Sequence, residues 1–537
     1  MPIFQCSKRI TNLQNLVFHK VHFFVLIKFF IFIKILNNIY ILRKENITMQ
    51  ILNKIKTHTT LIFYIYALVL FLLNFIRIFD NAFWGDEGFS IKLAKMFFSE
   101  MIDATAKDVH PPLYYMFAQL LYRIFGNEGF SYHLSSIIPY AIIMIIACTY
   151  VKYKFGYIST LVLITLSSLT SSALIYNVEV RMYAMGAMFV IISFLSLYEI
   201  LKYNKNKAWI IFIVSSLCAA YTHYYALISV AFFYLVMLLL AYSKRNYLKT
   251  TCIACLITII AYFPWLIILL KAFERTAKNW WLKDIPSLSN CLKFIFAYNW
   301  ISIIFIIFTL IFFLYQIKGF HLTKSNNQNF LIKFDFHFGI PKKITFSKEF
   351  IWIFAGIFSI FGTIAIGLTL SHLIRPFLVT RYLFPLSAMA YLILGYCISN
   401  LKYKRTWSIL LIIAFLASAI PNYLNTYKNE RTLNKSTIEF LTKVNPTENA
   451  IIYTNNSHLG WTLLEYYYPE AKGFYKPKAF ENLNITNHEI WFFWTKEFDE
   501  KIIQSINKQK YSCKQIHIGR FANGAKYYVY KLTKEVH

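Results

Sequence analysis

Long apolar runs alternate with short polar segments along most of the chain. The runs between residues 59 and 423 are each roughly 20 residues long, which is the length a helix needs to cross the hydrocarbon core of a membrane. Helices that are apolar all round cannot be buried by one soluble core. The pattern therefore predicts an all-α polytopic membrane protein with about eleven transmembrane helices. We expect them near residues 59–79, 134–151, 157–175, 183–200, 208–221, 225–242, 251–270, 292–317, 351–371, 383–399 and 407–423.

The chain becomes polar after residue 423, and its pattern there is that of a small soluble α/β unit. Apolar and aromatic runs at 450–454, 489–494 and 525–531 are typical of strands. Amphipathic stretches at 436–444, 458–468 and 497–508 are typical of helices. We therefore predict a C-terminal α/β domain at 424–537.

The first 48 residues do not fit this organisation. Residues 19–42 are apolar but carry three lysines, whereas Met49 is followed by a short basic segment and then by a clean apolar run. A basic segment before a first span is typical of a cytoplasmic N-terminus. We predict that Met49 is the true start and that 1–48 is a mis-assigned or extra N-terminal segment. If it is made, it forms an extra span or an interfacial helix.

Lysine and arginine are distributed unequally between alternate loops. One set of loops is rich in them: Lys152 and Lys154; Lys202, Lys205 and Lys207; Lys244, Arg245 and Lys249; the segment 318–348; and Lys402, Lys404 and Arg405. The rule that positive loops face the cytoplasm places this set inside. The transmembrane domain, 49–423, then has a long first outer loop at 80–133, and the domain at 424–537 is extracytoplasmic.

The composition changes this picture little. The chain has 537 residues, of which 58% are hydrophobic, and a formal net charge of +30. Because most of the basic excess lies in the short loops, we interpret it as topological and expect no nucleic-acid partner. The eight cysteines are scattered, and Cys252 and Cys255 lie inside an apolar run. They are more typical of helix residues than of a redox or zinc pair.

The candidate chemistry lies in the first outer loop, where two acidic clusters are held by stiff segments. Asp86 and Glu87 open the loop, and Asp108 and His110 come before two prolines that suit the first turn of a helix. That helix has an apolar stripe and is expected on the membrane surface. Each residue also has a plain structural explanation: Asp86 as a helix N-cap, Glu87 as a partner of the helix dipole, and His110 as part of a turn.

Two motifs together resemble a known family. Trp84-Gly85-Asp86-Glu87 and Asp108-x-His110-Pro111-Pro112-Leu113 resemble the first outer loop of the protein mannosyltransferases that use dolichyl- or polyprenyl-phosphate-mannose. They are also similar to bacterial relatives that transfer aminoarabinose to lipid A, and all belong to the GT-C superfamily. The resemblance covers most of residues 59–400. Supporting matches are Glu179-Val-Arg181-Met-Tyr183, Tyr221-Thr-His223-Tyr-Tyr225, Pro264-Trp265-Leu266 and Arg381-Tyr382-Leu383.

The chain departs from these families at two points. Its tail lacks the carbohydrate-binding module of the eukaryotic protein mannosyltransferases. The lipid A transferases carry lysine where this chain has His110.

The resemblance implies that Asp86 is the catalytic base, and the chemistry of a lipid-phosphate sugar agrees. Its leaving group departs as a phosphate anion without a general acid, so one carboxylate near the acceptor suffices. Fixed cations must stabilise the departing phosphate, and arginine does so by bidentate hydrogen bonds. The candidate catalytic residues are Asp86, Glu87 and Asp108. The candidate substrate-binding residues are His110, Arg181, Tyr183, His223, Arg375, Arg381 and Tyr382.

These expectations define the predicted function. The chain would transfer a sugar from a polyprenyl-phosphate donor to a cell-envelope glycan, lipid or protein at the outer face of the cytoplasmic membrane. No cofactor is expected, although three carboxylates leave room for a divalent cation. The alternative is a transporter or flippase of lipid-linked sugars. Such proteins usually show repeats and polar groups at mid-membrane, and this sequence has neither.

Overall fold

The computed structural model describes most of the chain beyond the N-terminal segment. The described residues are 49–79, 83–243, 247–278, 282–318, 347–401, 403–443, 450–456, 460, 463–468, 472–475, 490–520 and 526–534. The predicted extra segment 1–48 and most of the predicted cytoplasmic loop at 318–348 lie outside them.

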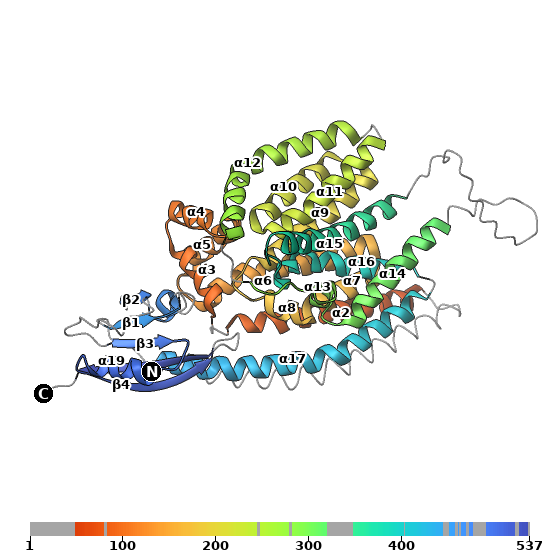
Figure 1. Cartoon of the computed structure of the whole chain (residues 1–537). Helices are drawn as coiled ribbons and strands as arrows, with labels where there is room; N and C mark the ends of the chain where they lie inside the picture. The colour runs from red at the N-terminus through yellow and green to blue at the C-terminus, as the bar shows by residue number, and fades with distance from the viewer. Residues whose placement is uncertain are drawn as a thin grey trace, which may run out of the picture.

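A bundle of long apolar helices forms the body of the molecule (Figure 1). Its first half consists of α2 (Met49–Phe75), η1 (Ile76–Phe79), α6 (Gly129–Ile146), η2 (Ala147–Val151), α7 (Lys152–Leu169), α8 (Ser171–Tyr176), α9 (Tyr183–Tyr203) and α10 (Asn206–Thr222). Its second half consists of α11 (Tyr224–Ser243), α12 (Leu248–Lys278), α13 (Leu288–Phe296), α14 (Asn299–Lys318), α15 (Lys348–Leu373), η4 (Thr380–Leu386), α16 (Ser387–Ser399) and α17 (Lys404–Lys443).

The predicted multi-pass membrane protein is confirmed, but the count of eleven spans is not. Within the described residues, eight helices are long and apolar enough to cross a membrane, or nine if the bent pair α13 and α14 is one span. All eleven predicted segments fall on helices. The run Gly129–Leu169 contains one of them and most of a second within 41 residues and is broken at Gly156, and α10, which contains another, has only 17 residues.

Two backbone breaks explain how these helices change direction. Gly156 has φ 84°, in the left-handed region that glycine enters without steric cost, and it interrupts α7 near its start. The axes of α13 and α14 differ by 93°. Between them Ala297 has φ 66°, an unusual value for a residue with a side chain.

The predicted first outer loop folds into three short helices at one end of the bundle: α3 (Gly85–Lys95), α4 (Phe98–Lys107) and α5 (Leu113–Phe125). Pro112 stands at the N-cap of α5, close to where the sequence placed the helix start. On α5, Leu120 and Ile124 are exposed whereas Tyr114 and Tyr115 are fully buried. An outward apolar stripe of this kind suits a helix that lies at the membrane surface.

The C-terminal residues form a five-stranded mixed sheet in the order β2-β1-β3-β5-β4. The strands are β1 (Ile451–Thr454), β2 (Lys472–Tyr475), β3 (Ile490–Trp494), β4 (Tyr511–Arg520) and β5 (Lys526–Lys534). The first three are mutually parallel, and β5 runs antiparallel to β3 and β4. The predicted strands correspond to β1, β3 and β5, whereas β2 and β4 were not predicted.

Both faces of the sheet are covered. Ile506 of α19 (Glu500–Asn507) belongs to the apolar cluster on one face. Leu441, near the end of α17, and Leu463 of the π-helical turn η5 (Leu463–Tyr467) belong to the cluster on the other. The 40-residue helix α17 runs along the bundle and reaches the sheet (Figure 1). The sheet therefore lies at the same end of the bundle as α3, α4 and α5.

Candidate active site

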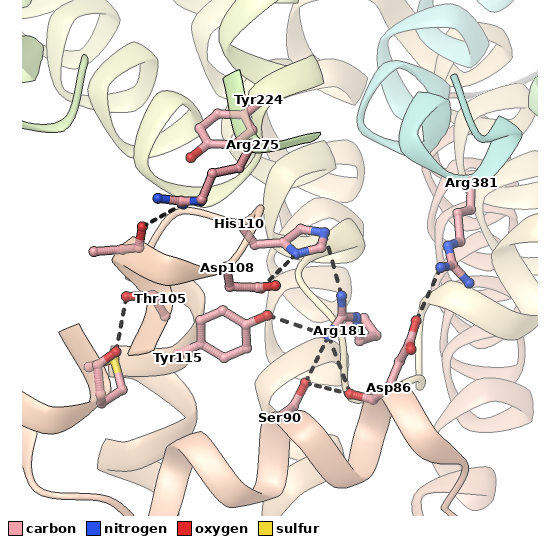
Figure 2. Close-up of polar contacts among 12 residues, drawn as sticks. Asp86, Ser90, Thr105, Asp108, His110, Tyr115, Arg181, Tyr224, Arg275 and Arg381 are labelled. Atoms are coloured by element: carbon pink, nitrogen blue, oxygen red, sulfur yellow. Dashed lines mark hydrogen bonds and ion pairs between the residues drawn. The ribbon is translucent and has the colours of Figure 1, made fainter. Parts of the chain in front are cut away.

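Asp86 and Arg381 form an ion pair at the centre of the site. An Oδ2 atom of Asp86 lies 3.1 Å from Nη2 of Arg381, and the two side chains are only 14% and 20% exposed. Asp86 is in the first turn of α3, and Arg381 is in η4, so the pair joins the outer loop to the bundle (Figure 2). The N-cap position of α3 is Trp84. The explanation of Asp86 as an N-cap therefore does not hold.

Arg181 lies beside this pair and is almost completely buried, with 3% exposure. Its Nη1 donates to the carbonyl oxygen of Asp86 at 3.3 Å, to Oγ of Ser90 at 3.4 Å and to the hydroxyl of Tyr115 at 3.4 Å. Its Nη2 lies 3.5 Å from Nε2 of His110 (Figure 2). Within the described part of the chain, the Nε atoms of Arg181 and Arg381 are buried without a hydrogen-bond partner. An anion bound between the two guanidinium groups would supply acceptors for such donors.

Asp108 and His110 form a dyad that ends on Arg181. Oδ2 of Asp108 lies 3.1 Å from Nδ1 of His110. Burial lowers the pKa of His110, against the opposing effect of Asp108. Burial is the largest single effect and would raise the pKa of Asp108, but the hydrogen bond and charge of His110, together with the charge of Arg181, outweigh it and hold that pKa below its ordinary value. A neutral His110 with its proton on Nδ1 donates to Asp108 and accepts from Arg181 through Nε2. The dyad therefore orients the guanidinium.

Glu87 is held away from this network by backbone groups. Its Oε1 accepts from the N–H of Val180 at 2.9 Å, and its Oε2 accepts from the N–H of Trp84 at 3.1 Å. The indole N–H of Trp84 donates to Oε1 of Glu179 at 3.1 Å. Burial raises the pKa of both glutamates. The charge of Glu179 adds to the rise in pKa for Glu87, and the charge of Asp86 adds to the rise in pKa for Glu179. Glu87 thus fastens the start of α3 to the segment before α9.

Aromatic rings line the side of the network that faces the bundle. The ring centroid of Tyr382 lies 6.2 Å from that of His110 and 5.3 Å from that of His223. The rings of Tyr183 and His223 are 5.7 Å apart. The hydroxyl of Tyr183 is buried without a hydrogen-bond partner among the described residues. These rings bring three more of the predicted substrate-binding residues to the same place.

An apolar cavity of about 380 Å³ begins at these rings. His110, His223 and Tyr382 line it on the side of the network. Aliphatic and aromatic residues of α11, α12 and α15 line the rest, including Leu227, Phe273 and Leu370. The site thus joins buried cations to a space that suits a hydrocarbon chain.

Comparison with known proteins agrees with the motifs in the sequence. The family model described as dolichyl-phosphate-mannose-protein mannosyltransferase matches residues 109–268. This range begins beside Asp108 and ends in α12, so it includes His110, Arg181, Tyr183 and His223. A search of the curated proteins found no match.

The solved structure of ArnT from Cupriavidus metallidurans in the apo state, a GT-C glycosyltransferase, resembles the whole fold. The TM-score is 0.53 at 9% sequence identity, and the match covers 89% of this chain and 98% of that chain. The chain therefore has an ArnT-like fold. A second structure of the same ArnT, bound to undecaprenyl phosphate, matches with a TM-score of 0.47 at 11% identity, covering 88% of this chain and 98% of that chain.

The ArnT-like fold brings most of the predicted site residues together. One network with its aromatic wall contains Asp86, Asp108, His110, Arg181, Tyr183, His223, Arg381 and Tyr382. Two predicted residues lie outside it. Glu87 faces backbone donors, and Arg375, half-buried after α15, makes none of the contacts described above. Different partners contact the carboxylates of Asp86, Glu87 and Asp108. No group of three potential metal ligands is present in the described residues.

The motifs did not single out three residues of the candidate site. Ser90 is one helical turn after Asp86 and so lies on the same face of α3. Tyr115 is in the first turn of α5, just beyond the two prolines, where α5 turns it toward Arg181. Trp84 belongs to the first motif, but the motif assigned no role to it. The helical spacing from Asp86 was the signal that could have found Ser90.

Proposed function

We propose that this protein is a GT-C glycosyltransferase that transfers a sugar from a polyprenyl-phosphate carrier to an acceptor hydroxyl or amine, with Asp86 as general base. The observation that carries the proposal is the Asp86–Arg381 pair beside buried Arg181, at the mouth of an apolar cavity. The sequence match to proteins described as using dolichyl-phosphate-mannose supports the same class of donor.

The arrangement suits the chemistry of a lipid-phosphate sugar. The acceptor atom attacks the anomeric carbon, the bond from that carbon to the phosphate oxygen breaks, and the polyprenyl phosphate leaves as an anion. Arg181 and Arg381 stabilise this anion by charge and by fixed hydrogen bonds. Asp86 takes the proton that the acceptor loses, so the charges balance without a general acid.

The ion pair also suggests how donor binding prepares the base. Arg381 is engaged with Asp86 in an ion pair. A carrier phosphate offers Arg381 a second anion, and the guanidinium can then share its donors between the two. This leaves the carboxylate freer to accept a proton from the acceptor. Arg181 stays in place throughout, because His110, Tyr115 and Ser90 hold it.

The cavity supports a lipid carrier over a soluble donor. Its walls are the outer ends of membrane helices, and its volume of about 380 Å³ is enough for part of a prenyl chain. A sugar nucleotide would leave this apolar space empty, whereas a polyprenyl chain would fill it and place its phosphate at the arginines.

We also propose that the site faces the outside of the cytoplasmic membrane, with 49–423 as the transmembrane domain and 424–537 as an extracytoplasmic domain. Lys152, Lys154 and Lys202 gather at the opposite end of the bundle, which supports that end as cytoplasmic. In a variant without native cysteines, an impermeant thiol reagent added outside should label Asn507→Cys and not Lys205→Cys. Labelling of Lys205→Cys alone would reverse the orientation.

The test of the reaction is turnover by purified protein with a panel of polyprenyl-phosphate sugars. Asp86→Asn keeps size and hydrogen bonding but cannot accept a proton. The rate should fall by roughly a hundredfold to ten-thousandfold, the range that a positioned base contributes, and carrier binding should change little. Asp86→Asn with wild-type turnover would remove Asp86 from the mechanism. Lack of turnover by the wild type with every donor in the panel would remove the proposed function.

A further inference from the structure

The C-terminal domain contacts the loop that carries Asp86 through one turn, η5. The ring of Tyr466 meets Phe83 edge-on at 4.7 Å and Tyr132 at 6.4 Å. Phe83 and Tyr132 are themselves buried, with 2% and 0% exposure. Beside them, Nζ of Lys95 on α3 donates to the backbone carbonyl of Glu465. The turn therefore contacts α3 near both of its ends.

Trp84 connects this contact to the site. Its ring packs against the apolar cluster of the C-terminal domain that contains Leu463. The guanidinium of Arg381 lies over the same ring, with Cζ 5.6 Å from its centroid. Its indole N–H donates to Glu179, and its backbone N–H donates to Glu87. Trp84 thus contacts the C-terminal domain, the phosphate-binding candidate Arg381, and Glu87, which links the start of α3 to the segment before α9.

The segment around η5 is also hydrogen-bonded to the long helix α17. The hydroxyl of Tyr468 donates to the carbonyl oxygen of Leu441 in α17 at 2.8 Å, which ties the turn to the long helix from the bundle. The domain is therefore anchored to the bundle by α17 and to the outer loop by η5. Trp84 and Asp86 lie between these two anchors.

We propose that Tyr466 and Trp84 are positioning residues: the C-terminal domain holds the Asp86 loop through Tyr466, and Trp84 sets Arg381 beside Asp86. The inference rests on the proposed glycosyl transfer for its effect on rate. Tyr466 touches no reacting group and acts through Phe83 and Trp84. Because a small displacement of a catalytic group slows a reaction strongly, weakening this contact lowers kcat while the carrier's own contacts remain.

The first experiment separates kcat from KM for the carrier in the full-length protein. Tyr466→Ala should lower kcat on the order of tenfold and change KM little, which is the signature of an interaction that matters in the transition state. Tyr466→Phe keeps the ring contacts and should retain wild-type kcat. The matched control is Tyr528→Ala, which removes a half-buried tyrosine from the opposite face of the same sheet. It should leave kcat unchanged.

A double-mutant cycle tests the route through Trp84. Trp84→Phe keeps a ring under Arg381 but loses the N–H that reaches Glu179. If Tyr466 acts through Trp84, the loss in the double variant will be smaller than the product of the two single losses. Independent, multiplicative losses would overturn the route, and equal losses in Tyr466→Ala and Tyr528→Ala would show only a damaged domain.

Hydrogen exchange separates this inference from the reaction itself. Tyr466→Ala should increase exchange in residues 83–95 whether or not the protein turns over any sugar donor, and Tyr528→Ala should not. If the wild type has no turnover but this exchange pattern appears, the proposed function fails and the positioning contact stands. Unchanged exchange in residues 83–95 would overturn the positioning contact.

Discussion

The two ends of the helix bundle both collect cations and aromatic rings, yet they use them differently. Helix α9 joins the ends: Arg181 comes just before it, and Tyr203 is the last of its 21 residues. At the first end, Arg181 is buried and held by a network of hydrogen bonds. At the other, Lys154 lies over the ring of Tyr203, with 4.8 Å between Nζ and the centroid, and it pairs with Glu199 near the surface.

The difference shows what each cation is suited to do. Lysine is a flexible point charge that can reach water, and at the end of a membrane helix it anchors the helix and sets its direction. The guanidinium of a buried arginine is shielded from water and presents its N–H donors in a fixed planar geometry, which suits the binding of a planar or tetrahedral anion. The comparison therefore predicts that exchanging arginine and lysine will lower activity strongly at the buried end and leave it unchanged at the other.

The largest expected effect is that of exchanging Arg181 for lysine. Arg181→Lys keeps the charge but cannot reach Ser90, Tyr115 and His110 at once, so the cation loses its orientation. Turnover with the preferred polyprenyl-phosphate sugar should fall by roughly a hundredfold to a thousandfold, as when one donor to a developing anion is removed. The matched control is the reverse exchange, Lys154→Arg, which should leave turnover unchanged. Similar losses in both variants would mean that the two ends do not differ in function.

The sequence predicted this contrast in part. Loop charges separated the two ends, and the position of arginines at the ends of spans predicted Arg181 and Arg381 as candidates for binding the carrier phosphate. Arg375 also lies at the end of a predicted span. The pattern of loop charges could not show that it lies outside the network. Its position depends on how the backbone after α15 turns, and that turn depends on tertiary packing.

Asp86 and Glu87 show a second limit of the sequence. The motif presents them as a pair, but neighbouring residues on a helix point about 100° apart. Asp86 therefore meets Arg381, whereas Glu87 meets the N–H groups of Trp84 and Val180. The same limit affected the C-terminal domain. The short strand β2 and the polar, partly exposed β4 lack the apolar runs that identified the other strands.

The next effect in size is a pH dependence that only the buried end should show. Burial lowers the pKa of His110, so the ring is neutral at neutral pH and its Nε2 can accept from Arg181. As the pH falls through this lowered pKa, below 6.5, Nε2 gains a proton that faces the guanidinium. Activity should then fall by about tenfold per pH unit. The free energy of unfolding also falls as the pH drops below 6.5, because the unfolded chain binds this proton at a higher pH than the folded protein does.

The measurement is a profile of kcat/KM between pH 5 and 8 for wild type and His110→Gln. Glutamine can donate to Asp108 and accept from Arg181, and it has no proton to gain. The variant should lose the acidic decline that His110 causes, although its rate at pH 7 will be lower. Asp108, Arg181, Asp86 and His223 all face or adjoin the ring. An unchanged profile would assign the decline to one of these neighbours instead.

A smaller effect on activity is expected when the hydrogen bonds of Glu87 to the N–H groups of Trp84 and Val180 are weakened. Glu87→Gln leaves one acceptor oxygen for two buried N–H groups, so unfolding free energy should fall by about 1–3 kcal/mol. Thermal unfolding in detergent measures this loss. Turnover well below the melting temperature should remain far above that of Asp86→Asn. If Glu87→Gln abolished turnover without lowering stability, Glu87 would be a catalytic residue, as the sequence motif suggested.

The smallest effect is expected at the lysine-rich end. Nζ of Lys152 lies 4.1 Å from the ring centroid of Tyr64 and also donates to its hydroxyl, and both residues are partly exposed. A cation–π contact at an exposed site contributes about 0.5–1 kcal/mol. Lys152→Gln should therefore lower thermal stability slightly and leave kcat/KM unchanged. Loss of this cation weakens only the topological signal, and Lys154 and Lys202 remain on the same side, so the orientation should persist. A large loss of turnover in a correctly inserted Lys152→Gln protein would show that this end also serves the reaction, and the division between an anchoring end and a reacting end would be wrong.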